Sequence, residues 1–205
     1  MPAPSLPKRL LLTLAAAFLA YQSYGLWAFA KTVPTFSPAA QVAYALALGL
    51  FVTGVFAFAG FAWPTHRLLP DGYYAIGRPA RLRRVYRALG VEHFRRFLLA
   101  TFWRSDAQRA KYFTGTRAGL GRLATMSRKS EFGHLAPLVA LAVAAGVLIA
   151  RGAGWAAAAL TLANLLGNGY PILLQRDHRR RLTVLRRRYG LVGVRMAAPA
   201  GPGRW

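Results

Sequence analysis

The hydrophobic residues of this 205-residue chain gather into four long runs, with polar and basic segments between them. The runs cover residues 10–30, 39–62, 135–150 and 153–174. A helix needs about 20 predominantly apolar residues to cross a bilayer, so each run is predicted to be a transmembrane helix, although the third is short for a crossing. The pattern therefore predicts an all-α integral membrane protein with four transmembrane helices.

Between the second and third runs lies one long polar insertion, residues 65–133, which is predicted to carry amphipathic helices. In the first of these, apolar residues recur at helical spacing opposite a row of arginines, and Gly90 is expected to end the helix. The apolar positions are Leu82, Val85, Tyr86 and Leu89, and the arginines are Arg81, Arg83, Arg84 and Arg87. A second amphipathic stretch covers residues 91–103. We expect both helices to lie at the membrane interface, with their arginines on the phosphates of anionic phospholipids.

The net charge of +23 at pH 7 raises the question of a nucleic-acid partner, since basic patches bind phosphate backbones. The distribution of the charge indicates a membrane topology instead. Of the 28 Lys and Arg residues, only Lys31 and Arg151 fall in the two short connections between runs. The positive-inside rule therefore places both termini and the insertion in the cytoplasm, and no nucleic-acid partner is predicted.

The sequence predicts a single membrane domain over residues 1–196 and a disordered tail, residues 197–205, that is rich in Ala, Pro and Gly. Ala28-Phe29-Ala30 has the form of a signal-peptide cleavage site, but the run before it is longer than a typical signal core of about 7 to 15 residues. We expect the first helix to be retained. The absence of cysteine excludes disulfides, thiolate metal ligands and a cysteine nucleophile.

Two polar residues, Glu131 and His134, stand three residues apart at the foot of the third run. On a helix they share a face, so the carboxylate is predicted to orient the imidazole as a general base. The alternative is an interfacial pair that merely ends the helix. A metal site is not predicted, because His-Glu-x-x-His is absent, and nothing in the spacing requires Asp71 or His178 to complete a ligand set.

The fourth run carries a polar stripe formed by Asn164, Asn168 and Gln175. A polar stripe in lipid is expected to face protein or a cavity, and the asparagines alternatively serve only to hold helices together. Pro171 has no amide hydrogen, so we expect a distorted helix in which the carbonyl of Gly167 is freed.

A cluster of basic residues directly follows the fourth hydrophobic run, residues 153–174. It includes Arg176, Arg179 and Arg181, close to Gln175. Arg176 and Arg179 share one helical face, from which their guanidinium groups can bind a phosphate or carboxylate in bidentate fashion. Anchoring to lipid headgroups is the alternative interpretation of this cluster.

Together these residues resemble the glycosyl-diaponeurosporenoate acyltransferases, small bacterial membrane enzymes that place a fatty acyl group on the sugar of a carotenoid glycoside. The resemblance rests on three patches. They are Asp71-Gly72, Glu131-x-x-His134, and Asn168 followed by Gln175-Arg176-x-x-Arg179-x-Arg181-Leu182. Asp177-His178 stands where the family often has Tyr-Asn.

The resemblance implies acyl transfer in a bacterial cytoplasmic membrane, in a bundle with a cavity toward the cytoplasmic leaflet. His134 and Glu131 would be catalytic, with Glu131 fixing the tautomer of His134. Substrate would be bound by Asp71, Asn168, Gln175, Arg176, Arg179 and Arg181. Arg176 or Asn168 would hold the oxyanion, and Arg179 and Arg181 the phosphate of an acyl-CoA or acyl-carrier-protein donor. No tightly bound cofactor is implied, and the acceptor would be an amphiphile such as a carotenoid glycoside that enters from the membrane lipid.

Two other functions remain open from the sequence. The first is a noncatalytic membrane subunit that binds a pigment, a lipid or a partner protein, for which the aromatic content of 13% is sufficient. It predicts that Glu131 and His134 do not contact one another. The second is a metal-assisted lipid hydrolase.

Overall fold

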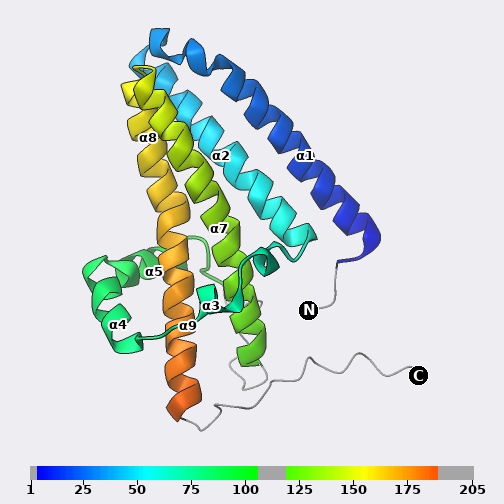
Figure 1. Cartoon of the computed structure of the whole chain (residues 1–205), viewed down its shortest axis with the longest axis vertical. Helices are drawn as coiled ribbons and strands as arrows, with labels where there is room; N and C mark the ends of the chain where they lie inside the picture. Colours follow the sequence, from blue (N-terminus) through cyan, green and yellow to red (C-terminus); the bar gives the residue numbers. More distant parts are fainter. Residues whose placement is uncertain (1–3, 106–118, 189–205) are drawn as a thin grey trace.

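The computed structural model describes residues 4–105 and 119–188, which form helices and turns with no strand among them. Four helical segments in this part of the chain are long and apolar enough to cross a membrane, which confirms the predicted all-α membrane fold (Figure 1). They are α1 (Leu6–Ala28), α2 (Pro38–Ala62), α7 (Gly119–Ala150), and the uninterrupted succession of α8 (Gly154–Asn164), η4 (Leu165–Gly169) and α9 (Tyr170–Arg188).

The third and fourth transmembrane segments are longer than predicted. The third begins at Gly119, so residues 119–133, assigned from the sequence to the insertion, are part of α7. A 32-residue helix is about 48 Å long, whereas the hydrocarbon core is about 30 Å thick. The first turns of α7 and the last turns of α9 therefore project beyond the bilayer core. Hydropathy detects only the apolar part of such helices.

The apolar core lies where α2, α7 and α8 meet, near the turn between α7 and α8. Its buried residues include Ala45, Leu48, Leu141, Ala145, Leu148, Ala156, Ala157 and Leu160. The alanines let the helices approach closely, as is common in membranes. One buried polar residue, Gln41, closes this end of the bundle, because its Oε1 accepts from the amide of Ala156 at 3.3 Å while its Nε2 donates to the carbonyl of Phe36 at 3.2 Å.

Helix α1 lies against α2 on the outside of the bundle and leaves a hollow beside it. Gly54 permits the contact, since a Cβ there would come within 2.6 Å of the Leu19 side chain. The hollow, of about 300 Å³, is bounded by α1, α2 and α7 and is lined by apolar residues such as Trp27, Val52 and Leu141. It lies among the transmembrane helices, whereas the expected cavity is at their cytoplasmic ends.

The insertion forms four short helices, η3 (Thr65–Leu68), α3 (Asp71–Tyr74), α4 (Pro79–Ala88) and α5 (Val91–Ala100). Helices α4 and α5 pack beside α9, on the side away from α1, whereas η3 contacts α7 and α2 (Figure 1). Gly90 joins α4 to α5 with a left-handed φ of 68°, as expected for a residue that ends a helix.

The two amphipathic helices are confirmed, but their apolar residues face protein as well as the outside. Tyr86 and Val91 are buried against Leu174, and the ring of Phe94 lies 5.1 Å from the ring of Tyr170. Val85, Leu89, Phe97 and Phe102 remain exposed and are suited to contact lipid. The helices are thus docked on α9. The predicted tail, residues 197–205, lies outside the described residues.

Candidate active site

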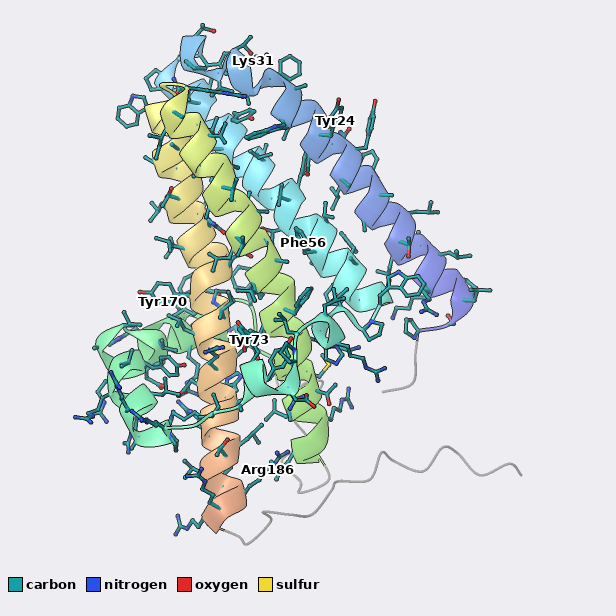
Figure 2. All side chains as sticks on the ribbon, viewed as in Figure 1. Tyr24, Lys31, Phe56, Tyr73, Tyr170 and Arg186 are labelled. Carbon is teal, nitrogen blue, oxygen red and sulfur yellow. The ribbon has the colours of Figure 1, made fainter. Side chains whose placement is uncertain are left out.

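The projecting part of α7 faces the start of α9, and α3 lies between them. Figure 2 shows Tyr73 of α3 in this position. Five of the sequence-predicted residues on α7 and the fourth transmembrane segment fall into two groups. A charged group contains Glu131, Arg176 and Arg179, and a neutral group contains His134 and Asn168.

The charged group is a buried ion cluster. Glu131, whose side chain is 0% exposed, accepts from Nε of Arg176 at 2.9 Å and from Nη2 of Arg179. Arg179 also donates to Ser127 Oγ at 3.0 Å and to the carbonyl of Tyr74 at 3.3 Å. A buried charge is stable only when it is paired and hydrogen-bonded, and Glu131 meets both conditions.

The predicted contact between Glu131 and His134 is wrong. Both carboxylate oxygens of Glu131 bind guanidinium groups, and Nδ1 of His134 instead lies 3.1 Å from Oδ1 of Asn168. The spacing of three residues permits the contact but does not enforce it. A permanently charged, forked guanidinium is a stronger partner for a carboxylate than a neutral imidazole. On this point the structure agrees with the expectation for a noncatalytic subunit.

The neutral group forms a hydrogen-bond chain across three transmembrane helices. Nδ2 of Asn168 donates to Oδ1 of Asn164 at 3.0 Å and to Oγ1 of Thr53, on α2, at 3.1 Å. Nδ2 of Asn164 donates in turn to the carbonyl of Leu138, on α7, at 2.9 Å. The expected polar stripe therefore faces protein, and it binds α2 and α7 to the fourth segment.

The helix around Asn168 is irregular, as Pro171 predicts. Residues Leu165–Gly169 form a turn of π-helix in which the amide of Tyr170 donates to the carbonyl of Leu165. Pro171 has no hydrogen to donate to the carbonyl of Gly167, so this carbonyl lacks its usual partner within the helix. Such π turns often mark functional sites, and this one places the buried Asn168 against the imidazole.

Three of the predicted substrate-binding residues lie outside both groups. Arg181 binds Oδ2 of Asp177 at 2.7 Å and Oε2 of Glu92 at 3.1 Å, which ties α9 to α5. Asp71, whose side chain is 88% exposed, pairs with Arg128 at the surface. Gln175 is buried, and its backbone carbonyl accepts a hydrogen bond from Ser127 Oγ at 2.9 Å.

Two neighbouring tyrosines of α3 complete the charged group, and sequence reasoning missed them. The guanidinium of Arg176 lies 4.8 Å from the ring centre of Tyr73, and that of Arg179 lies 5.4 Å from the ring centre of Tyr74. Burial, with the nearby Glu131 carboxylate, raises the pKa of Tyr73 and raises the pKa of Tyr74 to about 12. Both phenols therefore stay protonated at neutral pH. The signal that could have found these tyrosines is their position directly after Asp71-Gly72, one of the three patches that resemble the family.

The sequence analysis also missed Ser127 and Thr53. A lone hydroxyl in an apolar helix most often bonds its own backbone, so neither residue type signals a contact with another helix. Within the described residues, no group of three His, Cys, Asp or Glu side chains is placed to hold a metal ion.

A family model described as glycosyl-4,4'-diaponeurosporenoate acyltransferase matches residues 70–188, more than half of the chain. The matched region runs from the turn before α3 to the end of α9, so it contains both polar groups except for Thr53. No curated protein and no solved structure matches the chain.

Proposed function

The chain belongs to the glycosyl-4,4'-diaponeurosporenoate acyltransferase family, and on that premise we propose that it moves a fatty acyl group from a thioester donor to a hydroxyl of a lipid-linked sugar. The sugar of a carotenoid glycoside is the acceptor that the family name suggests. The observation that carries the proposal is the pair of His134 and Asn168, which places an oriented imidazole at the boundary of the bilayer core.

In the proposed reaction His134 is the general base. It takes the proton of the acceptor hydroxyl, the oxygen attacks the thioester carbonyl, the C–S bond breaks, and the proton passes to the departing sulfur. Asn168, rather than Glu131, holds the imidazole. Because the acyl group goes directly to the acceptor, the reaction needs no tightly bound cofactor.

We assign two roles to the charged group. Part of it supports the fold, and part of it binds the acyl donor. Arg179 is 6% exposed, and its donors are directed to Glu131, Ser127 and the Tyr74 carbonyl, so it is poorly placed to receive a donor phosphate. Arg176 is 29% exposed and Arg181 is 44% exposed. We therefore assign the phosphate of an acyl-CoA or acyl-carrier-protein donor to these two residues, with Arg176 the nearer to the reacting carbonyl. Glu131 positions Arg176.

The acceptor reaches this site from within the membrane. Leu141 lies two turns beyond His134 on α7, or about 10 Å away along the helix, and it lines the hollow between α1, α2 and α7. A lipid whose hydroxyl lies at His134 can therefore extend its hydrocarbon tail into that hollow. We place the protein in the bacterial cytoplasmic membrane with both termini inside, where the exposed arginines of α4 contact anionic phospholipids.

Mass spectrometry of lipid and pigment extracts tests the function. Cells that lack the gene are compared with cells rescued by the wild type, by His134→Ala, or by His93→Ala, which changes an exposed histidine of α5 as a matched control. We expect one acylated glycolipid to disappear, and its unacylated precursor to accumulate, in the deletion and in His134→Ala only. Blotting confirms equal protein levels.

A noncatalytic membrane subunit is the second candidate, because Glu131 and His134 have separate partners. It predicts identical extracts from all four strains. That result would overturn the acyltransferase proposal.

A further inference from the structure

We propose that Asn164 and Thr53 set the tautomer of His134, so that the neutral ring carries its hydrogen on Nδ1 and has its lone pair on Nε2. The assignment of the tautomer stands on the hydrogen-bond chain alone. Its catalytic meaning, that Nε2 is the nitrogen that takes the acceptor's proton, rests on the proposed function.

The first step is the orientation of Asn164. Its side-chain amide lies 2.9 Å from the carbonyl oxygen of Leu138, and a carbonyl can only accept a hydrogen bond. The NH₂ group of Asn164 must therefore point toward Leu138, and its Oδ1 must point the other way. The backbone carbonyl of Leu138 therefore fixes which end of the Asn164 amide carries the nitrogen. Without such an obligate acceptor, the nitrogen and oxygen of a side-chain amide are hard to tell apart.

The second step transfers this orientation to Asn168. Oδ1 of Asn164 is an acceptor, so the atom of Asn168 that lies 3.0 Å from it must be the donor Nδ2. The second hydrogen of the same NH₂ group goes to Thr53 Oγ1 at 3.1 Å. Asn164 and Asn168 are 4% and 2% exposed, so bulk water cannot replace these partners. The carbonyl oxygen of the Asn168 side chain is left facing His134.

The third step reaches the imidazole. Oδ1 of Asn168 accepts, so Nδ1 of His134, 3.1 Å away, must donate. Asn168 is thus the residue that contacts the base, and Asn164 and Thr53 are positioning residues that act through it.

The proposal predicts different results for substitutions that look equally mild. Asn164→Leu removes the acceptor that holds the Asn168 amide, so this amide is free to turn its NH₂ group toward the ring and favour the Nε2–H tautomer. Asn168→Asp keeps an acceptor opposite Nδ1 and preserves the Nδ1–H tautomer. Thr53→Val leaves Oδ1 of Asn164 in place, which can only accept, whereas the hydroxyl that remains in Asn164→Leu can also donate, so Thr53→Val shifts the tautomer less and gives a mixture.

The test is ¹⁵N–¹H NMR of the full-length protein in detergent micelles, with ¹⁵N-histidine and at a pH where the rings are neutral. The spectrum separates the Nδ1–H tautomer, the Nε2–H tautomer and the imidazolium, and His134→Gln identifies the signal of His134 among the four histidines. We expect the Nδ1–H pattern in the wild type and in Asn168→Asp, and a majority of Nε2–H in Asn164→Leu. His178 serves as an internal check that a variant is folded.

An Nε2–H pattern in the wild type overturns the proposal, even if no variant folds. An unchanged Nδ1–H pattern in folded Asn164→Leu overturns the role of Asn164. Because no substrate is present, the spectra are independent of the acyltransferase assignment. If the tautomer is as expected but His134→Ala leaves the lipid extracts unchanged, the proposed function fails and the tautomer stands. Turnover in Asn164→Leu should fall mainly through kcat.

Discussion

The charged and neutral groups both join α7 to the fourth transmembrane segment, but they differ in how completely their polar atoms are used. Glu131 is enclosed by two guanidinium groups, and Arg179 has three different partners. His134 is held through Nδ1 by one neutral amide. Charge in a buried site must be neutralised before the fold is stable, so the buried members of the charged group, Glu131 and Arg179, serve the fold. A neutral imidazole with a second ring nitrogen retains a capacity for proton transfer.

The largest expected effect comes from breaking the charged group. Glu131→Gln leaves two guanidinium groups without a buried counterion, so the free energy of unfolding should fall by about 3 to 5 kcal/mol. Denaturant unfolding in detergent micelles measures this. The control is Asp71→Asn, which removes the exposed pair with Arg128 and should cost less than about 1 kcal/mol. Equal losses in the two variants would contradict a structural role for Glu131.

Breaking the neutral group should act on rate instead of stability. His134→Gln keeps a polar side chain of similar length but removes the base, so turnover should fall by about 10² to 10⁴. Its free energy of unfolding should change less than that of Glu131→Gln. Acyl transfer from a thioester to a glycolipid, measured in proteoliposomes, gives the rate. If the two variants lose stability equally, the division between the groups is wrong.

The two arginines should differ within the charged group. Arg179→Lys loses the fork that joins Glu131, Ser127 and the Tyr74 carbonyl, and a hydrogen bond to a charged group is worth about 1.5 to 3 kcal/mol. Arg176→Lys, at a partly exposed site, should cost less stability but raise the KM for the thioester donor. The same shift in KM for both variants would argue against the assignment of the donor phosphate to Arg176.

A smaller effect is expected at the hollow between α1, α2 and α7, where we place the hydrocarbon tail of the acceptor. Ala140→Phe fills space between α1 and α7, so the rate with a long-tailed acceptor should fall roughly tenfold relative to a short-tailed one. Ala158→Phe, on an exposed position of α8, is the matched control. An unchanged ratio of kcat/KM values for the two acceptors would exclude the hollow as the tail site.

The smallest effect concerns the ion pairs of Glu92, which binds Arg95 within α5 and Arg181 on α9. The hydrogen bond from Arg95, with the charges of Arg95 and Arg181, lowers the pKa of Glu92 from 4.5 to about 2. A lowered folded-state pKa means that the contribution to stability is complete above pH 4.5 and is lost as the pH falls through 2. The difference in melting temperature between the wild type and Glu92→Gln should therefore be small near neutral pH and vanish in acid. A difference that grows on acidification would contradict this.

Much of the fold could be predicted because its causes are local. Four apolar runs predict four membrane helices, and the arginines opposite Leu82 and Tyr86 predict an amphipathic helix that Gly90 ends. The start of α7 was missed because polar turns outside the bilayer carry no hydropathy signal. The docking of α4 and α5 on α9 was missed because the same apolar face suits either lipid or Leu174.

The candidate site shows where local reasoning stopped. Spacing placed Glu131 and His134 on one face, and that remains true, yet the partners of each come from residues more than 30 positions away. Pro171 correctly predicted a distorted helix, whereas the contact of Asn168 with Thr53 joins two helices that no pattern relates. The assignments of the residues that bind the acyl donor and the acyl acceptor stay predictions.

The sequence by itself determined that this chain crosses a membrane four times and which residue types meet near its polar boundary, since apolar length and charge distribution suffice for both. Only the tertiary structure decided which polar groups are partners. Guanidinium groups on α9 outcompete an imidazole for Glu131, and a carbonyl on α7 orients two asparagines that then hold His134. Such choices depend on which donors and acceptors the packing of helices brings within 3 Å or so, and that distance is not written in the order of residues.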